Sequence, residues 1–95
     1  MIKHMIMIKL NDSSEKSINE VKAKLLTMDG KVPMISDLEV LGDVLHSDRS
    51  YDVFLSALVE DENALDAYQN DPYHCEIKTY IRSVAKSVIA VDAVL

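Results

Sequence analysis

The sequence predicts an α+β fold in which helices cover one face of a four-stranded antiparallel sheet. Three observations predict it. The chain has 95 residues, which is enough for one domain with a single core, here taken as residues 1–95. Segments with the alternation or composition of strands are interspersed with segments of helical periodicity. Their order joins the strands through helical crossovers and one hairpin, as in an α+β sandwich.

The first strand is expected in MIKHMIMIKL, where the isoleucines alternate with lysines and methionines and share one face with His4. The turn-prone NDSS follows. Ser17 and Glu20 offer one capping box as a start for the first helix, and the apolar spacing extends that helix to about residue 29. Gly30 suits its end.

The second strand is expected in DLEVLGDVL and the third in YDVFLSALV, with HSDRS as the hairpin loop between them. Gly42 interrupts the second strand and predicts a bulge or bend there. Asp61 then caps a short helix, and Asp71 with Pro72 starts another. The last strand is SVIAVDAVL. The order βαββ(αα)β, with the second helical segment split at Pro72, indicates a ferredoxin-like sandwich.

Strands three and four are apolar on both faces, although helices can cover only one face of a sheet. On the face away from the helices, the third strand carries Phe54 and Leu58, and the fourth strand carries Ile89, Val91 and Ala93. Four strands present a face of roughly 400 Å², about the largest apolar patch that a monomer normally exposes. We therefore expect a homodimer paired through the open sheet face, burying ~800 Å² per partner.

Composition excludes several classes of partner. Sixteen acidic against ten basic residues give a net charge of −6, which argues against nucleic acid. The lone Cys75 cannot form a disulfide within the chain, so a reducing compartment is expected. No apolar run is long enough for a signal peptide or a spanning helix. The sequence predicts a cytoplasmic protein with no membrane partner.

The stretch YQNDPYHCEI holds the candidate chemistry. His74 would be the third residue of its helix, at the edge of the buried stripe, where the helix dipole favours the neutral ring that can act as a base. Alternatively, His74 only binds a backbone carbonyl or Tyr68 and fixes the helix junction. Tyr68 could donate a hydrogen bond to a carbonyl or an enolate, or be a core residue with a solvated hydroxyl.

Two further histidines receive different expectations. His4 lies on the apolar face of its strand, where it is either a core residue with its hydrogen bonds satisfied or part of a ligand pocket. His46 is expected in a solvated loop. His74 and Cys75 diverge by ~100° on a helix, and no Cys or His pair has zinc-like spacing. Neither a metal nor a cofactor is therefore expected.

Five segments together, IKHMIMIKL, VP.I..LEV, YDVFLSALVED, ALDAYQNDPYH and VIAVD, follow the order and spacing of one family across nearly the whole chain. The sequence resembles the Dabb family, the stress-responsive dimeric α/β-barrel proteins. The resemblance implies two ferredoxin-like protomers paired through their sheets to form a barrel. It also implies a stress-related role or, as in one plant member, a polyketide cyclase that closes a ring by intramolecular aldol condensation.

In that cyclase the histidine after the proline acts as base and the tyrosine before it as polarising group. The matching positions are His74 and Tyr68, and the strand-one histidine of the same pocket matches His4. Two positions depart from the pattern. Asp71 stands where many relatives carry a second histidine, and Ala93 where an aromatic residue is common.

Two hypotheses follow. In the first, a cleft between helices and sheet binds a small carbonyl-bearing or aromatic molecule, and His74 and Tyr68 perform cyclase- or lyase-like chemistry without a cofactor. In the second, the protein is a non-catalytic stress or interaction protein, its role is a stable homodimer or larger assembly, and its own side chains fill the cleft. A cofactor-free monooxygenase is a distant third. An open or a filled space beside His74 separates the first two.

Overall fold

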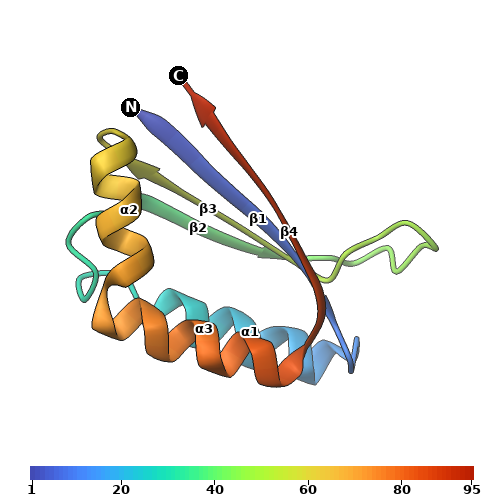
Figure 1. Cartoon of the computed structure of the whole chain (residues 1–95). Helices are drawn as coiled ribbons and strands as arrows, with labels where there is room; N and C mark the ends of the chain where they lie inside the picture. The colour runs from blue at the N-terminus through green and yellow to red at the C-terminus, as the bar shows by residue number, and fades with distance from the viewer.

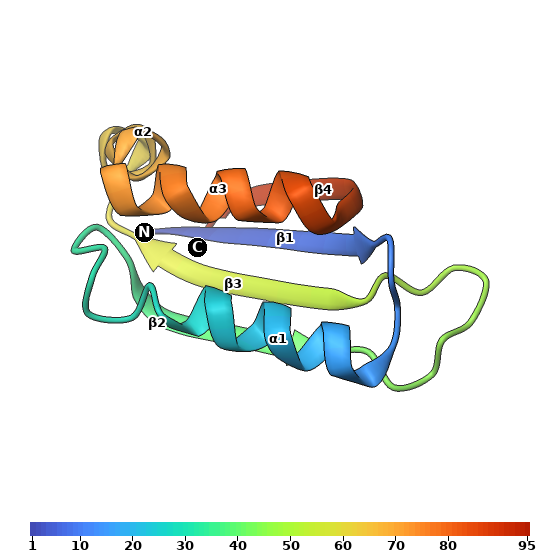
Figure 2. The ribbon, with the colours of Figure 1, turned by 90° about the horizontal axis from the view of Figure 1, so that it is seen from below.

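The computed structural model describes residues 1–95 and contains four strands and three helices. The sheet has the order β2-β3-β1-β4 with every neighbouring pair antiparallel. Helices α1 and α3 lie against one face of this sheet and α2 packs at one end, as Figures 1 and 2 show. The ferredoxin-like prediction is confirmed. The elements are β1 (Ile2–Leu10), α1 (Glu15–Leu26), β2 (Ser36–Gly42), β3 (Val53–Val59), α2 (Glu62–Asn70), α3 (Pro72–Val84) and β4 (Ala85–Val94).

Helix α1 begins earlier than the capping-box prediction, which was wrong. Its N-cap is Ser14, whose hydroxyl accepts a hydrogen bond from the Ser17 N–H at 3.2 Å. The Asp12 carboxylate accepts from the Ser17 hydroxyl at 2.8 Å, so Ser17 already lies inside the first turn. At the other end the helix stops at Leu26, and Gly30, with φ of 78°, lies in the turns that follow.

Gly42 does not form the predicted bulge. The register of β2 against β3 shifts between Ser36 and Glu39 instead, beside Asp37 with its φ of 49°. A Cβ at Gly42 would lie 2.7 Å from Cγ2 of Ile18 in α1. The absence of a side chain therefore allows α1 to pack closely on β2. The strand ends at Gly42, and the loop 43–52 is longer than the predicted HSDRS and projects from the sheet (Figure 2).

Asp52 joins the start of β3 to the end of β1. Its side chain is buried, and its carboxylate accepts hydrogen bonds from the Leu10 N–H at 2.8 Å and the Ser13 hydroxyl at 3.1 Å. Its own N–H donates to the Ile8 carbonyl at 2.9 Å. This carboxylate therefore satisfies a backbone donor exactly where the β1 ladder ends and the chain turns toward α1.

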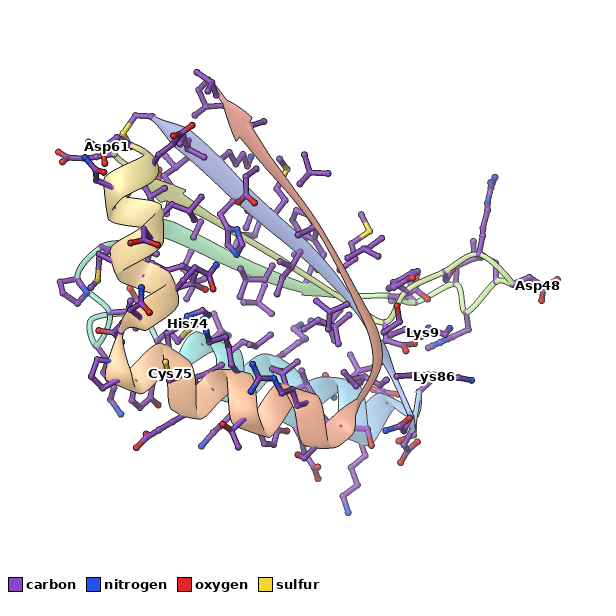
Figure 3. All side chains as sticks on the ribbon, viewed as in Figure 1. Lys9, Asp48, Asp61, His74, Cys75 and Lys86 are labelled. Carbon is purple, nitrogen blue, oxygen red and sulfur yellow. The ribbon has the colours of Figure 1, made fainter.

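Replacing Asp52 with alanine is expected to lower the free energy of unfolding by about 2–3 kcal/mol, because the Leu10 N–H loses a charged acceptor in a buried place. Urea denaturation checks this. Asp48→Ala is the control, since Asp48 lies at the exposed tip of the 43–52 loop (Figure 3) and should change stability by less than about 0.5 kcal/mol. Equal, small effects of both substitutions would contradict the bracing role of Asp52.

The two faces of the sheet differ in what covers them. The face toward the helices carries most of the buried residues of β1 and β3, whereas no element of the chain covers the opposite face in Figures 1 and 2. The strand register forms one apolar row across all four strands on that outer face: Leu41, Phe54, Met7 and Ile89. The prediction of two-sided apolar strands is confirmed. None of the helices has the length and apolar composition needed to cross a membrane.

Candidate functional site

A cavity of about 380 Å³ lies between the sheet and the helices, bounded by β1, β3, α1, α2, α3 and β4. Its volume could hold about a dozen atoms the size of a water molecule. The walls are mainly apolar, and polar side chains gather where α2 meets α3. The space beside His74 and Tyr68 is therefore open, which is the feature that separates the two hypotheses drawn from the sequence. The apolar lining residues are Ile6, Leu25, Met28, Leu55, Ile77, Ile81, Val88 and Ala90.

His74 is fixed at the first turn of α3, as Figure 3 shows. Asp71 caps this helix by accepting a hydrogen bond from the His74 N–H at 3.0 Å, and Pro72 occupies the first turn, as predicted. The imidazole Nδ1 lies 2.9 Å from the Tyr68 carbonyl oxygen. Because a carbonyl only accepts, Nδ1 carries the proton and Nε2 holds a free lone pair. The ring thus fixes the helix junction and presents a potential base.

The His74 ring is neutral at pH 7. Burial lowers its pKa from 6.5 to about 4, against the opposing effect of the hydrogen bond to the Tyr68 carbonyl. The Lys78 ammonium lowers the pKa further. The neutral ring agrees with the expectation from the sequence, but burial rather than the helix dipole is the main cause.

The pKa of His74 predicts a pH dependence of stability. Between pH 4 and 6.5 the unfolded chain binds this proton more tightly than the folded protein does. The stability gained from the neutral ring is therefore complete above pH 6.5 and is lost as the pH falls through that window, by less than about 3 kcal/mol because solvent near the ring screens the effect.

Urea denaturation of wild type and His74→Asn at pH 7 and pH 4.5 measures this loss. Asparagine keeps an N–H where Nδ1 donates to the Tyr68 carbonyl but does not titrate, so the variant should show a weaker pH dependence. His46→Asn is the control, because His46 lies exposed in the 43–52 loop. Identical pH dependence in wild type and His74→Asn would contradict the buried neutral ring.

Tyr68 lies between the two histidines and is only 1% exposed. Its ring stacks on His74 at a centroid distance of 3.8 Å and meets His4 edge-on at 5.4 Å. Burial raises the pKa of the phenol, and the Asp92 and Asp71 charges raise it further, so the hydroxyl stays protonated. The Tyr68 hydroxyl has no hydrogen-bond partner in the chain. Every side-chain N or O atom that is fully enclosed does have a partner, so this hydroxyl must be accessible. It therefore opens into the cavity that Tyr68 lines.

His4 faces the helices, as predicted, and is paired with a residue that sequence reasoning missed. Asp92 lies opposite His4 in the β1–β4 register, and its Oδ1 is 2.5 Å from Nδ1 of His4. Since a carboxylate only accepts hydrogen bonds, Nδ1 carries a proton and Nε2 faces the cavity. The Asp92 carboxylate therefore fixes the tautomer and the orientation of the His4 ring. A lone acid within the apolar run VIAVDAV was the signal that could have identified Asp92.

The remaining candidates lie away from the cavity. Cys75 is exposed in the first turn of α3 (Figure 3) and does not line the cavity, and His46 is exposed in the loop after β2. Ala93 pairs with Lys3 on the outer sheet face, so this departure from the family pattern does not alter the cavity. Asp71 serves as the cap of α3. No group of three or more His, Cys, Asp or Glu side chains is arranged to hold a metal ion.

Comparisons with solved structures identify the same fold in proteins of low sequence identity. A dimeric ferredoxin-like protein of unknown function from Thermobifida fusca is 22% identical, with a TM-score of 0.84 over 99% of this chain and 90% of that one. A dimeric ferredoxin-like protein of unknown function from Bacteroides fragilis is 18% identical, with a TM-score of 0.82 over 99% and 95%. The hydroxynitrile lyase of Passiflora edulis is 11% identical, with a TM-score of 0.83 over 99% and 92%.

Among curated protein sequences, none matches this chain. The model of the stress-responsive A/B barrel domain, Dabb, matches residues 2–95, which is nearly the whole chain. The sheet order, the helices on one face and the cavity between them accord with that match. The chain belongs to the stress-responsive A/B barrel (Dabb) family.

Proposed function

We propose that the protein is a homodimer in which each protomer binds a small carbonyl-bearing molecule and transfers a proton next to the carbonyl without a cofactor. One observation carries the proposal. The Tyr68 hydroxyl and the Nε2 atoms of His4 and His74 have no partner in the chain, and they adjoin one end of a cavity whose walls are mainly apolar. Polar groups gathered in an apolar pocket are the usual form of a small-molecule site.

The geometry gives each group a role in proton transfer. The neutral Nε2 of His74 accepts the proton from the carbon beside the carbonyl, and the electrons of that C–H bond form the C=C bond of an enolate. The carbonyl π electrons move onto oxygen, where the Tyr68 hydroxyl donates a hydrogen bond. His4, oriented by Asp92, binds the ligand from the β1 side of the site. The imidazolium of His74 then returns a proton to carbon.

Pairing through the outer sheet face is part of this proposal. That face carries an apolar row across all four strands, and Met7 at its centre is 44% exposed in the single chain. The similar proteins from Thermobifida fusca and Bacteroides fragilis are described as dimeric. A second copy placed there would cover the apolar row while leaving each cavity, on the other face of its sheet, open.

Catalysis has a precedent within the fold, since one similar structure is a hydroxynitrile lyase. The test uses 2-decanone, an uncharged ketone with an apolar chain that suits the cavity walls. Proton NMR in D₂O follows the exchange of its α-hydrogens. The wild-type protein is expected to accelerate exchange over buffer, and His74→Asn should remove about 10²- to 10⁴-fold of that acceleration. His46→Asn is the control and should exchange like wild type.

Three outcomes separate the readings. Accelerated exchange that depends on His74 supports the proposed chemistry. If 2-decanone raises the melting temperature but its α-hydrogens exchange no faster than in buffer, the protein binds the ketone without catalysing proton transfer. Neither binding nor exchange would favour the non-catalytic interaction protein, with the open sheet face as its functional surface.

A further inference from the structure

The cavity has a second polar region on α3, apart from the imidazoles. His74, Lys78 and Arg82 are spaced four residues apart, so they follow one row along the helix, and all three line the cavity. At about 1.5 Å rise per residue, Lys78 lies about 6 Å and Arg82 about 12 Å from His74 along the helix axis. Arg82 therefore places a basic group at the end of the cavity far from His74.

The two basic groups differ in their partners. The Lys78 ammonium donates a hydrogen bond to the Gln69 carbonyl at 2.8 Å, which holds it against the end of α2. The Arg82 guanidinium forms no hydrogen bond and no ion pair with any group in the chain. This is notable in a protein with a net charge of −6, where acidic partners outnumber basic ones. The one carboxylate that lines the cavity, Asp92, is bound to His4.

The position of Arg82 in the last turn of α3 also suits the helix dipole. The helix dipole would be equally well served by an arginine on any side of that turn. The dipole therefore does not explain why Arg82 lies on the side that lines the cavity. Between it and His74 the same helix contributes the buried side chains of Ile77 and Ile81. Along α3 the cavity is therefore lined first by the His74 imidazole, then by the apolar side chains of Ile77 and Ile81, and finally by the unpaired Arg82 guanidinium.

We infer that the ligand is an apolar carboxylic acid that also carries a carbonyl group. This inference rests on the proposed function and specifies its substrate class. The carbonyl oxygen binds at Tyr68, the apolar chain lies along Ile77 and Ile81, and the carboxylate binds Arg82. A guanidinium is suited to this role because its planar N–H groups can donate two parallel hydrogen bonds to one carboxylate.

Calorimetric titration with decanoate and 1-decanol tests the inference, because the two probes share a chain and differ in charge. The wild-type protein is expected to bind decanoate at least tenfold more tightly than 1-decanol. Arg82→Gln should weaken decanoate binding about tenfold and change 1-decanol binding less than twofold. Arg49→Gln is the matched control, since Arg49 is the other arginine of the chain and lies exposed in the 43–52 loop, so both affinities should stay as in wild type.

A third titration with 2-decanone separates the failure of this inference from the failure of the proposed function. Binding of 2-decanone with no preference for decanoate overturns the carboxylate inference alone. Decanoate binding that Arg82→Gln leaves unchanged also overturns it, because the carboxylate would then bind elsewhere, for example at the histidines. If none of the three probes binds, the ligand-binding function itself is overturned, and the inference with it.

Discussion

Replacing Met7 with glutamate is expected to convert the protein from a dimer to a monomer. Met7 lies at the centre of the outer sheet face, between Phe54 on β3 and Ile89 on β4. In the dimer both glutamates would be buried within the apolar row of the interface, and burying a charge there costs several kcal/mol. The dissociation constant should rise at least 100-fold, because each 1.4 kcal/mol is a factor of ten. Sedimentation velocity at micromolar concentration measures the change.

Leu26→Glu is the matched control for this experiment. Leu26 is 45% exposed, almost the same as Met7 at 44%, but it lies on α1, away from the open sheet face. The control variant should remain a dimer, and Met7→Glu should remain folded because position 7 is partly exposed in the single chain. A wild-type protein that sediments as a well-folded monomer, or a Met7→Glu variant that stays dimeric, would contradict pairing through this face.

Tyr68→Phe should abolish most of the proton exchange and leave stability nearly unchanged. The hydroxyl has no partner in the chain, so its removal strands no buried donor or acceptor. The ring remains to stack on His74. Loss of one donor to a developing oxyanion lowers rates by about 10²- to 10³-fold. NMR exchange of 2-decanone and urea denaturation measure the two effects on the same samples.

The matched control is Tyr73→Phe on the same helix as His74. The Tyr73 hydroxyl is already bonded to the Thr27 hydroxyl at 2.5 Å, and Tyr73 does not line the cavity. This variant should therefore exchange 2-decanone as wild type does. If Tyr68→Phe instead lowers the free energy of unfolding by more than about 1 kcal/mol and leaves exchange intact, Tyr68 is a structural residue and its proposed role in polarising the carbonyl is wrong.

Local sequence signals predicted the structure correctly where the signal lies within a single helix or strand. The alternation in β1 placed His4 toward the helices, and Asp71 with Pro72 marked the start of α3. The errors arose where a distant contact decides the structure. Gly42 resembles a bulge in sequence, but its role is to admit Ile18 of α1, and packing between elements is not visible in the strand's own pattern.

The same distinction holds for the candidate site. Tyr68 and His74 are close in sequence and were predicted to lie near a helix junction, where the structure stacks them. Asp92 was missed because its partner His4 is 88 residues away and only the β1–β4 register aligns them. Arg82 was missed because its exposed position looks like an ordinary charged helix face until α3 is packed beside the open edge of the cavity.

A crystal structure of the protein soaked with 2-decanone would show which atoms of the cavity meet the carbonyl group. We expect the ketone oxygen at about 2.7–2.8 Å from the Tyr68 hydroxyl, with an α-carbon facing Nε2 of His74 and the chain along Ile77. If the ketone binds outside the cavity, or inside it with its oxygen directed away from both Tyr68 and the histidines, proton transfer at this site is ruled out.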